Sequence, residues 1–166
     1  MKRHSFRASL ALALLAVTGI AGPLAAAEQV PFKGSLEGTV TVTPVPGSPP
    51  TIVDVLVDGT GTATQLGQFT FTIPHRVDRA ARTASGAYHI TAANGDTLSA
   101  DFTGQSMPTA TLGVISIVET ATITGGTGRF AGATGSFNCE RSYDTFTGTT
   151  TGSFKGTISP PTAGNP

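Results

Sequence analysis

Apolar and polar residues alternate with a period of two along most of this chain, and this alternation restricts the fold more than any other feature. Successive side chains of a β-strand point to opposite faces, so the period indicates half-buried strands. Threonine, which favours strands, is frequent, and 21 glycines punctuate the alternating segments. Helical patterns are nearly absent beyond the first 27 residues. The sequence therefore predicts an all-β domain.

The alternation predicts eight strands joined by short connections. They are expected at Phe32–Thr43, Ile52–Val57, Leu66–Val77, Thr83–Ala92, Thr97–Thr103, Gly113–Thr124, Ser136–Phe146 and Thr149–Ile158. Short connections favour an antiparallel meander, and closure into an eight-stranded antiparallel β-barrel removes the exposed edges. An immunoglobulin-type sandwich is the alternative. That class usually has a core Trp and often a Cys pair, whereas this chain has no Trp and one Cys.

The first 27 residues have the pattern of a bacterial secretory signal peptide. Basic residues precede the apolar run Leu10–Ile20, and three alanines at 25–27 supply a cleavage site. A membrane anchor is the alternative, but the apolar run is short for a span. We predict a signal peptide at 1–27, a single barrel domain at 28–159 and a disordered tail at 160–166. The protein is expected to be secreted or periplasmic.

The charge of the predicted mature chain argues against nucleic acid as a partner. Three of the ten basic residues and none of the ten acidic residues lie in 1–27, so the mature chain is net negative. Binding to nucleic acid or to an anionic membrane surface requires a basic patch. We expect neither partner, and no membrane span after signal removal. Cys139 is the only cysteine, so no internal disulfide is expected, and a buried, unreactive role is favoured.

A glycine-rich turn, residues 123–135, lies between the sixth and seventh predicted strands. Its motif residues are Gly125, Gly126, Thr127, Gly128, Phe130 and Gly135. The Gly125-Gly126 pair can adopt positive φ at low cost, which ends the sixth strand sharply. We predict one short helical turn near 127–132, capped by Thr127, with Phe130 closing one end of the barrel. Arg129 either captures an anion there or is a solvated charge that bonds nearby carbonyls.

The pattern GGTG-x-F-x-x-A-x-G in this turn resembles the strand-turn signature of plant dirigent proteins and of the allene oxide cyclase barrel group. Residues 59–70 and 92–98 extend the similarity to a group of small exported bacterial proteins of unsettled function. The resemblance covers most of residues 32–158. It implies an eight-stranded barrel, often trimeric, whose pocket folds a reactive intermediate along one stereochemical course. Its motifs mark turns, so catalytic residues are unknown and none is carried over.

Sequence patterns of common catalytic and metal sites are absent. The chain has no P-loop, Rossmann glycine pattern, HExxH, CxxC or GxSxG motif. Two histidines remain after the signal, and the aspartates at 54, 58, 96 and 101 do not follow a calcium-loop spacing. We therefore predict no metal and no cofactor.

Three polar side chains interrupt apolar strand faces. Glu119 alternates with isoleucines, Arg141 with Phe and Cys, and His75 shares a face with Phe69 and Phe71. If the sixth and seventh strands pair, Glu119 and Arg141 can form a buried ion pair, which offsets the cost of burying each charge. With Tyr143 and Tyr88 they are the candidate ligand-binding residues of a barrel pocket. The alternative is a structural ion pair and a satisfied core histidine.

Three functions agree with these observations. The first is binding of a small apolar or aromatic molecule in the barrel. The second is an isomerase or cyclase of the allene oxide cyclase or dirigent kind, which steers a reactive intermediate with few catalytic side chains. The third is a structural surface protein with a filled barrel. We rank binding first, and the resemblance adds a homotrimer as the implied assembly.

Overall fold

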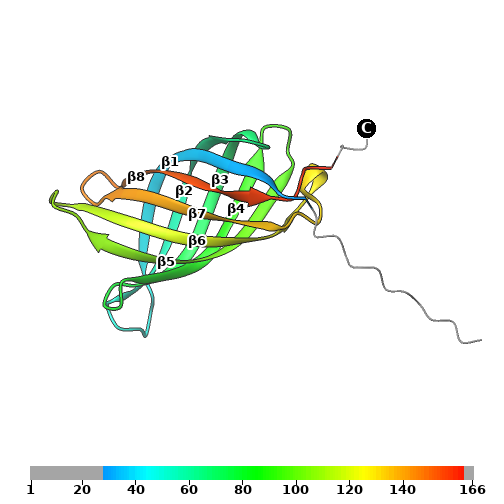
Figure 1. The fold of residues 1–166 in the computed structure, drawn as a ribbon. Helices are drawn as coiled ribbons and strands as arrows, with labels where there is room; N and C mark the ends of the chain where they lie inside the picture. Colours follow the sequence, from blue (N-terminus) through cyan, green and yellow to red (C-terminus); the bar gives the residue numbers. More distant parts are fainter. Residues whose placement is uncertain (1–27, 163–166) are drawn as a thin grey trace, which may run out of the picture.

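The computed structural model describes residues 28–162, which form one closed barrel of antiparallel strands (Figure 1). The strands are β1 (Val30–Pro44), β2 (Ile52–Ala63), β3 (Gly67–Asp78), β4 (Thr83–Ala92), β5 (Thr97–Pro108), β6 (Val114–Gly126), β7 (Gly135–Asp144) and β8 (Thr149–Ile158). Each strand pairs with its sequence neighbours, and β1 pairs with β8 to close the barrel. The predicted fold class is confirmed. The predicted signal peptide and residues 163–166 lie outside the described residues.

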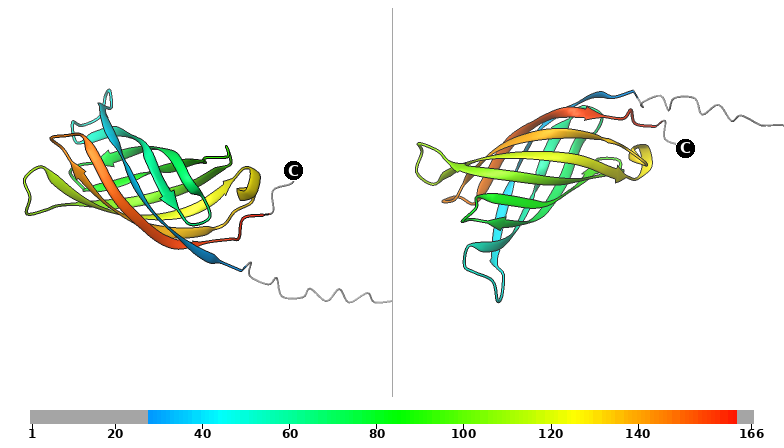
Figure 2. Two further views of the ribbon diagram at one scale, coloured as in Figure 1. Left: turned by 90° about the horizontal axis from the view of Figure 1, so that it is seen from above. Right: turned by 60° about the horizontal axis from the view of Figure 1, so that its bottom comes forward.

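The two ends of the barrel are built differently (Figure 2). The β1–β2, β3–β4, β5–β6 and β7–β8 connections form one end, which we call the open end. The β2–β3 and β4–β5 turns and the glycine-rich turn form the other, the closed end. The 3-10 helix η1 (Gly128–Phe130) lies at the closed end, within the range 127–132 predicted for a helical turn. No helix among residues 28–162 has the length and hydropathy to cross a bilayer.

Aromatic side chains fill the half of the interior next to the closed end. The ring of Phe137 lies 5.6 Å from that of Phe32, 5.3 Å from Tyr88 and 5.2 Å from Phe154, measured between centroids. These are the edge-on and tilted distances at which aromatic pairs stabilise a core. Phe130 of η1 is 1% exposed and adds to this cluster from the end of the barrel. The half next to the open end has six Val and two Ile among its lining residues and contains a cavity.

Two strands are longer than the alternation predicts. β2 continues past Val57 to Ala63, and β5 continues past Thr103 to Pro108. In β2 the inward positions after Val57 are Gly59 and Gly61, which lie opposite Phe71 and Phe69 of β3. A Cβ at Gly59 would lie 2.7 Å from the Cζ atom of Phe71. These glycines read as turn residues in the sequence, but in the barrel they leave room for the rings.

The glycine-rich turn departs from the prediction in its details. Gly125, Gly128 and Gly135 have positive φ, but Gly126 does not. Thr127 makes no capping bond to η1; its Oγ1 accepts from the backbone N–H of Thr97 at 3.1 Å. The turn is therefore attached to β5 and not only to itself.

At the closed end, Arg129 of the glycine-rich turn contacts both the β4–β5 turn and the C-terminal segment. Arg129 donates from Nε to Asp96 Oδ2 at 2.9 Å, so it pairs with a carboxylate of the Asn-Gly hairpin. Of the predicted tail, the structure describes Pro160–Thr162, and the N–H of Thr162 donates to the Arg129 carbonyl at 2.9 Å. The ion pair with Asp96 therefore engages Arg129, and Thr162 bonds its carbonyl.

Candidate functional site

A cavity of about 670 Å³ lies in the half of the barrel next to the open end. Its walls are mostly apolar, contributed by Val40, Val42, Val53, Val55, Val57, Val77, Ala84, Met107, Ile115 and Ile117. Glu119, Arg141, His75 and Tyr143 line the same cavity. An apolar hollow with a few convergent polar groups is the usual form of a small-molecule site.

Glu119 of β6 and Arg141 of β7 form a buried ion pair on the cavity floor. The direct partner of Glu119 in the β6–β7 ladder is Cys139, and that of Arg141 is Ile117, so the two charges are diagonal neighbours. Arg141 donates from Nε to Glu119 Oε2 at 3.1 Å and from Nη2 to Oε1. Both carboxylate oxygens are engaged by one guanidinium, the geometry that best offsets the cost of removing two charges from water.

Tyr88 and Thr150 complete the hydrogen bonds of this pair. Tyr88 of β4 donates its hydroxyl to Glu119 Oε2, reaching across β5 from two strands away. Thr150 Oγ1 accepts from Arg141 Nη1 at 3.5 Å and donates to the Ser142 carbonyl at 2.9 Å. In residues 28–162 no buried side-chain nitrogen or oxygen lacks a partner. Each polar atom of the network therefore has at least one partner, and such partnered groups rigidify a core.

Burial and the Glu119 carboxylate fix the protonation of this network. Burial, then Glu119, raises the pKa of Tyr88 well above its ordinary value, so the phenol remains a donor. Burial disfavours the charged form of Arg141, but Glu119 outweighs it and raises the pKa of Arg141. Burial also raises the pKa of the Cys139 thiol to about 12. Cys139 therefore stays a thiol at neutral pH, as expected for a buried, unreactive cysteine.

His75 of β3 presents a hydrogen-bond acceptor to the cavity. Its Nδ1 lies 2.9 Å from the Ile73 carbonyl, and because a carbonyl only accepts, Nδ1 carries the proton. Burial lowers the pKa of His75, which favours the neutral ring at neutral pH. Every buried side-chain nitrogen in the described part of the chain has a hydrogen-bond partner, whereas Nε2 of His75 has none. Nε2 is therefore accessible, and it can accept a proton or a hydrogen bond from a bound molecule.

Glycines on neighbouring strands give these side chains their space. Gly86 of β4 lies opposite His75, and Gly152 of β8 lies opposite Arg141. A Cβ at Gly152 would lie 2.5 Å from Arg141 Cγ, and one at Gly86 would collide with His75 Cβ. Long polar side chains can thus lie flat along the wall without filling the cavity above them.

The structure brings together four of the five candidate ligand-binding residues. Glu119, Arg141, His75 and Tyr143 line the cavity, whereas Tyr88 is 1% exposed and lies beneath the floor. The residues of the turn motif lie at the closed end. Sequence reasoning did not identify Thr150, which bonds Arg141. It also missed Arg79 and Arg82 of the β3–β4 turn, which line the cavity. No group of three or more potential metal-ligating side chains occurs in the described part of the chain.

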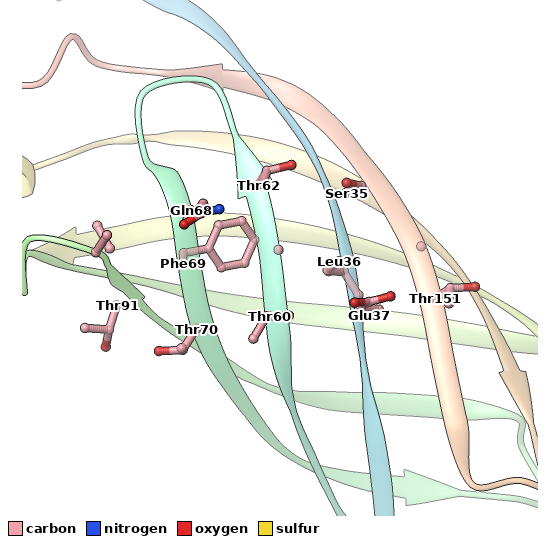
Figure 3. Close-up of a pocket in the computed structure, with 14 residues that line it drawn as sticks. Ser35, Leu36, Glu37, Thr60, Thr62, Gln68, Phe69, Thr70, Thr91 and Thr151 are labelled. Carbon is pink, nitrogen blue, oxygen red and sulfur yellow. The ribbon is translucent and has the colours of Figure 1, made fainter.

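A second, larger hollow of about 930 Å³ lies on the outer wall across β1, β2, β3, β4 and β8 (Figure 3). Half of its lining residues have exposed hydroxyl or amide side chains: Ser35, Thr60, Thr62, Gln68, Thr70, Thr91 and Thr151. Glu37 is its only charged residue. The polar side chains that line this hollow are all exposed, whereas Glu119 and Arg141 on the floor of the inner cavity are buried.

Comparison with known proteins connects this architecture to one fold. No protein-family profile matches the chain, and no curated protein does. Among solved structures, the pterocarpan synthase dirigent protein PsPTS1 superposes with a TM-score of 0.61 at 14% identity, over 82% of this chain and 97% of that one. The pterocarpan synthase dirigent protein GePTS1 gives 0.58 at 16% identity, over 84% and 95%. The chain has the dirigent-type barrel fold, and the resemblance seen in the glycine-rich turn is confirmed at the level of the fold.

Proposed function

We propose that this dirigent-type barrel is exported and binds a small, mostly apolar molecule in the cavity at its open end. One observation supports this most directly. The apolar cavity ends at a polar floor whose buried atoms each have a partner, and this floor still has hydrogen-bonding groups that no protein atom uses. Its volume of about 670 Å³ falls in the range of small-molecule pockets, roughly 300–1,000 Å³. A filled structural barrel would need side chains in this space. Export rests on the signal-like first 27 residues.

The floor indicates which groups the ligand carries at its inner end. A guanidinium has five N–H donors, and Arg141 uses three of them on Glu119 and Thr150. One N–H on each Nη is left for a ligand oxygen. His75 Nε2 accepts, so it suits a hydroxyl. A ligand whose buried end combines a carbonyl or ether oxygen with a hydroxyl matches both.

A paired-tryptophan experiment tests the binding site. N-phenyl-1-naphthylamine, an uncharged fluorescent probe, is titrated into the wild-type protein and two variants. Ile117 points into the cavity, and its neighbour Val118 is 44% exposed on the outer wall. Ile117→Trp is expected to abolish probe binding because the indole fills the cavity, and Val118→Trp to leave it unchanged. Equal binding by all three proteins would place the probe elsewhere, and no binding to the wild type would contradict the proposal.

A second candidate, an isomerase or cyclase, is favoured by the neutral His75. An accessible Nε2 with its proton on Nδ1 is the form that accepts a proton from a substrate. The likeness to two dirigent proteins named as pterocarpan synthases supports catalysis by holding a substrate in one conformation. One experiment distinguishes the two candidate functions: a ligand is extracted from the purified protein and then incubated with the protein again. A binding protein returns it unchanged; an enzyme returns an isomer of equal mass, and His75→Gln slows the conversion.

A further inference from the structure

Two arginines of the β3–β4 turn, Arg79 and Arg82, line the cavity at its open end. Figure 1 shows this turn beside the β1–β2 loop, on the side of the opening away from the tips of β5–β6 and β7–β8. The opening therefore has a cationic side. The inner part of the cavity carries one cation, Arg141, which is already paired with Glu119.

The backbone of this turn is fixed to its surroundings on both sides. The N–H of Arg79 donates to the Thr51 carbonyl at 2.8 Å, and the Arg82 carbonyl accepts from the N–H of Ser106 at 3.0 Å. Arg82 has a φ of 59°, a left-handed conformation that a non-glycine residue adopts only when its surroundings enforce it. These bonds fix the backbone from which the two side chains extend at the opening.

Arg79 and Arg82 differ from the three other arginines of residues 28–162 in forming no ion pair with a carboxylate. Arg76, Arg129 and Arg141 each form an ion pair, whereas within residues 28–162 neither arginine of this turn does. The adjacent carboxylate, Asp78, accepts from the N–H groups of Ala80 and Ala81 at 2.8 and 3.0 Å. Asp78 shapes the turn and keeps its negative charge there, but within residues 28–162 neither guanidinium group that lines the opening is ion-paired with it.

The floor and the opening together imply a polarity for the ligand. Glu119 and Arg141 neutralise each other and Tyr88 is uncharged, so a ligand charge at the floor would be buried without a partner, which is costly. At the opening, an anionic group would meet two guanidinium groups and still contact water. We infer that Arg79 and Arg82 form an anion subsite, and that the ligand is an apolar molecule with an uncharged inner end and an anionic outer end. This inference rests on the proposed function.

Two fluorescent probes of the same shape test this subsite. N-phenyl-1-naphthylamine and 1-anilinonaphthalene-8-sulfonate share one apolar body, and only the second carries a sulfonate. In Arg79→Gln/Arg82→Gln, the affinity for the sulfonate probe is expected to fall about tenfold, as for the loss of two exposed ionic contacts. The affinity for the uncharged probe is expected to stay within about twofold, because the apolar walls are untouched. Added salt should weaken sulfonate binding to the wild type and have little effect on the variant.

A charge-matched control separates a local subsite from overall charge. Lys33 and Lys155 are exposed register partners on β1 and β8. Lys33→Gln/Lys155→Gln removes the same two charges away from the opening and is expected to leave both affinities unchanged. An equal loss of sulfonate binding in both double variants, or no loss in Arg79→Gln/Arg82→Gln, would overturn the subsite while leaving the proposed function standing. Absence of binding of both probes to the wild type would contradict the proposed function itself, and with it the subsite.

Discussion

Gly104 lies directly opposite Glu119 across the β5–β6 ladder, and the Glu119 side chain occupies the space that a larger residue at 104 would fill. A Cβ at Gly104 would lie 2.9 Å from Glu119 Cγ. The same relationship holds for Gly152 with Arg141 and for Gly86 with His75. Three polar side chains of the cavity are therefore each placed by a glycine on the adjacent strand.

Gly104→Ala is expected to destabilise the barrel by about 1–3 kcal/mol, because the new methyl group displaces Glu119 from Arg141 and Tyr88. Urea unfolding measures this change. Thr103→Ala, one residue away on the outer face, is the control and should change the free energy of unfolding by less than about 0.5 kcal/mol. Equal effects of the two substitutions would show that the glycine does not place Glu119.

Breaking the Glu119–Arg141 pair from one side is expected to cost about 3–5 kcal/mol, because a buried charge or donor is left without its partner. Glu119→Gln and Arg141→Met are the single changes. The double variant should lose less stability than the sum of the two single variants, since neither group is then left uncompensated. Urea unfolding of all four proteins gives the coupling free energy. Strict additivity would mean that the two side chains do not interact.

The sequence predicts the ion pair on the condition that the sixth and seventh strands pair, because Glu119 and Arg141 interrupt the apolar faces of these two consecutive strands. It does not predict that Tyr88 bonds Glu119, because β4 and β6 are not adjacent and the contact forms only across a closed barrel. Gly59 and Gly61 read as turn residues in the sequence, although in the barrel they lie opposite Phe71 and Phe69 within a strand. Their role depends on register, which alternation does not fix.

The stability of the protein is expected to fall as the pH drops from about 7.5 to about 5.5, partly because of His75. Burial lowers the pKa of His75 in the folded state, whereas in the unfolded chain it has an ordinary pKa of about 6.5. The unfolded state therefore binds the proton first, and protonation favours unfolding. The ionised Asp54 and Asp96, whose pKa values are lowered by side-chain bonds to Arg76 and to Asn94 and Arg129, contribute only at lower pH.

Urea unfolding across this pH range checks the assignment to His75. His75→Gln should flatten the pH dependence, and His89→Gln, a change on the exposed outer face of β4, should retain it. An unchanged slope in His75→Gln would show that another group is responsible.

Phe130→Ala is expected to destabilise the barrel by about 3–5 kcal/mol, because it removes a fully buried ring from the closed end. Phe146→Ala is the matched control: its ring is 73% exposed at the open end, and its loss should cost below about 1 kcal/mol. Thermal or urea unfolding compares the two. Similar small losses would mean that Phe130 does not close the barrel.

Methyl NMR with N-phenyl-1-naphthylamine tests the central claim, a ligand site inside the open half of the barrel, most directly. The isoleucine δ1 methyl groups report on separate regions: Ile115 and Ile117 line the cavity, while Ile90, Ile123 and Ile158 are buried outside it. Probe titration is expected to shift the signals of Ile115 and Ile117 and to leave those of Ile90, Ile123 and Ile158 in place. Probe binding without a shift at Ile115 or Ile117, or no probe binding at all, would contradict it.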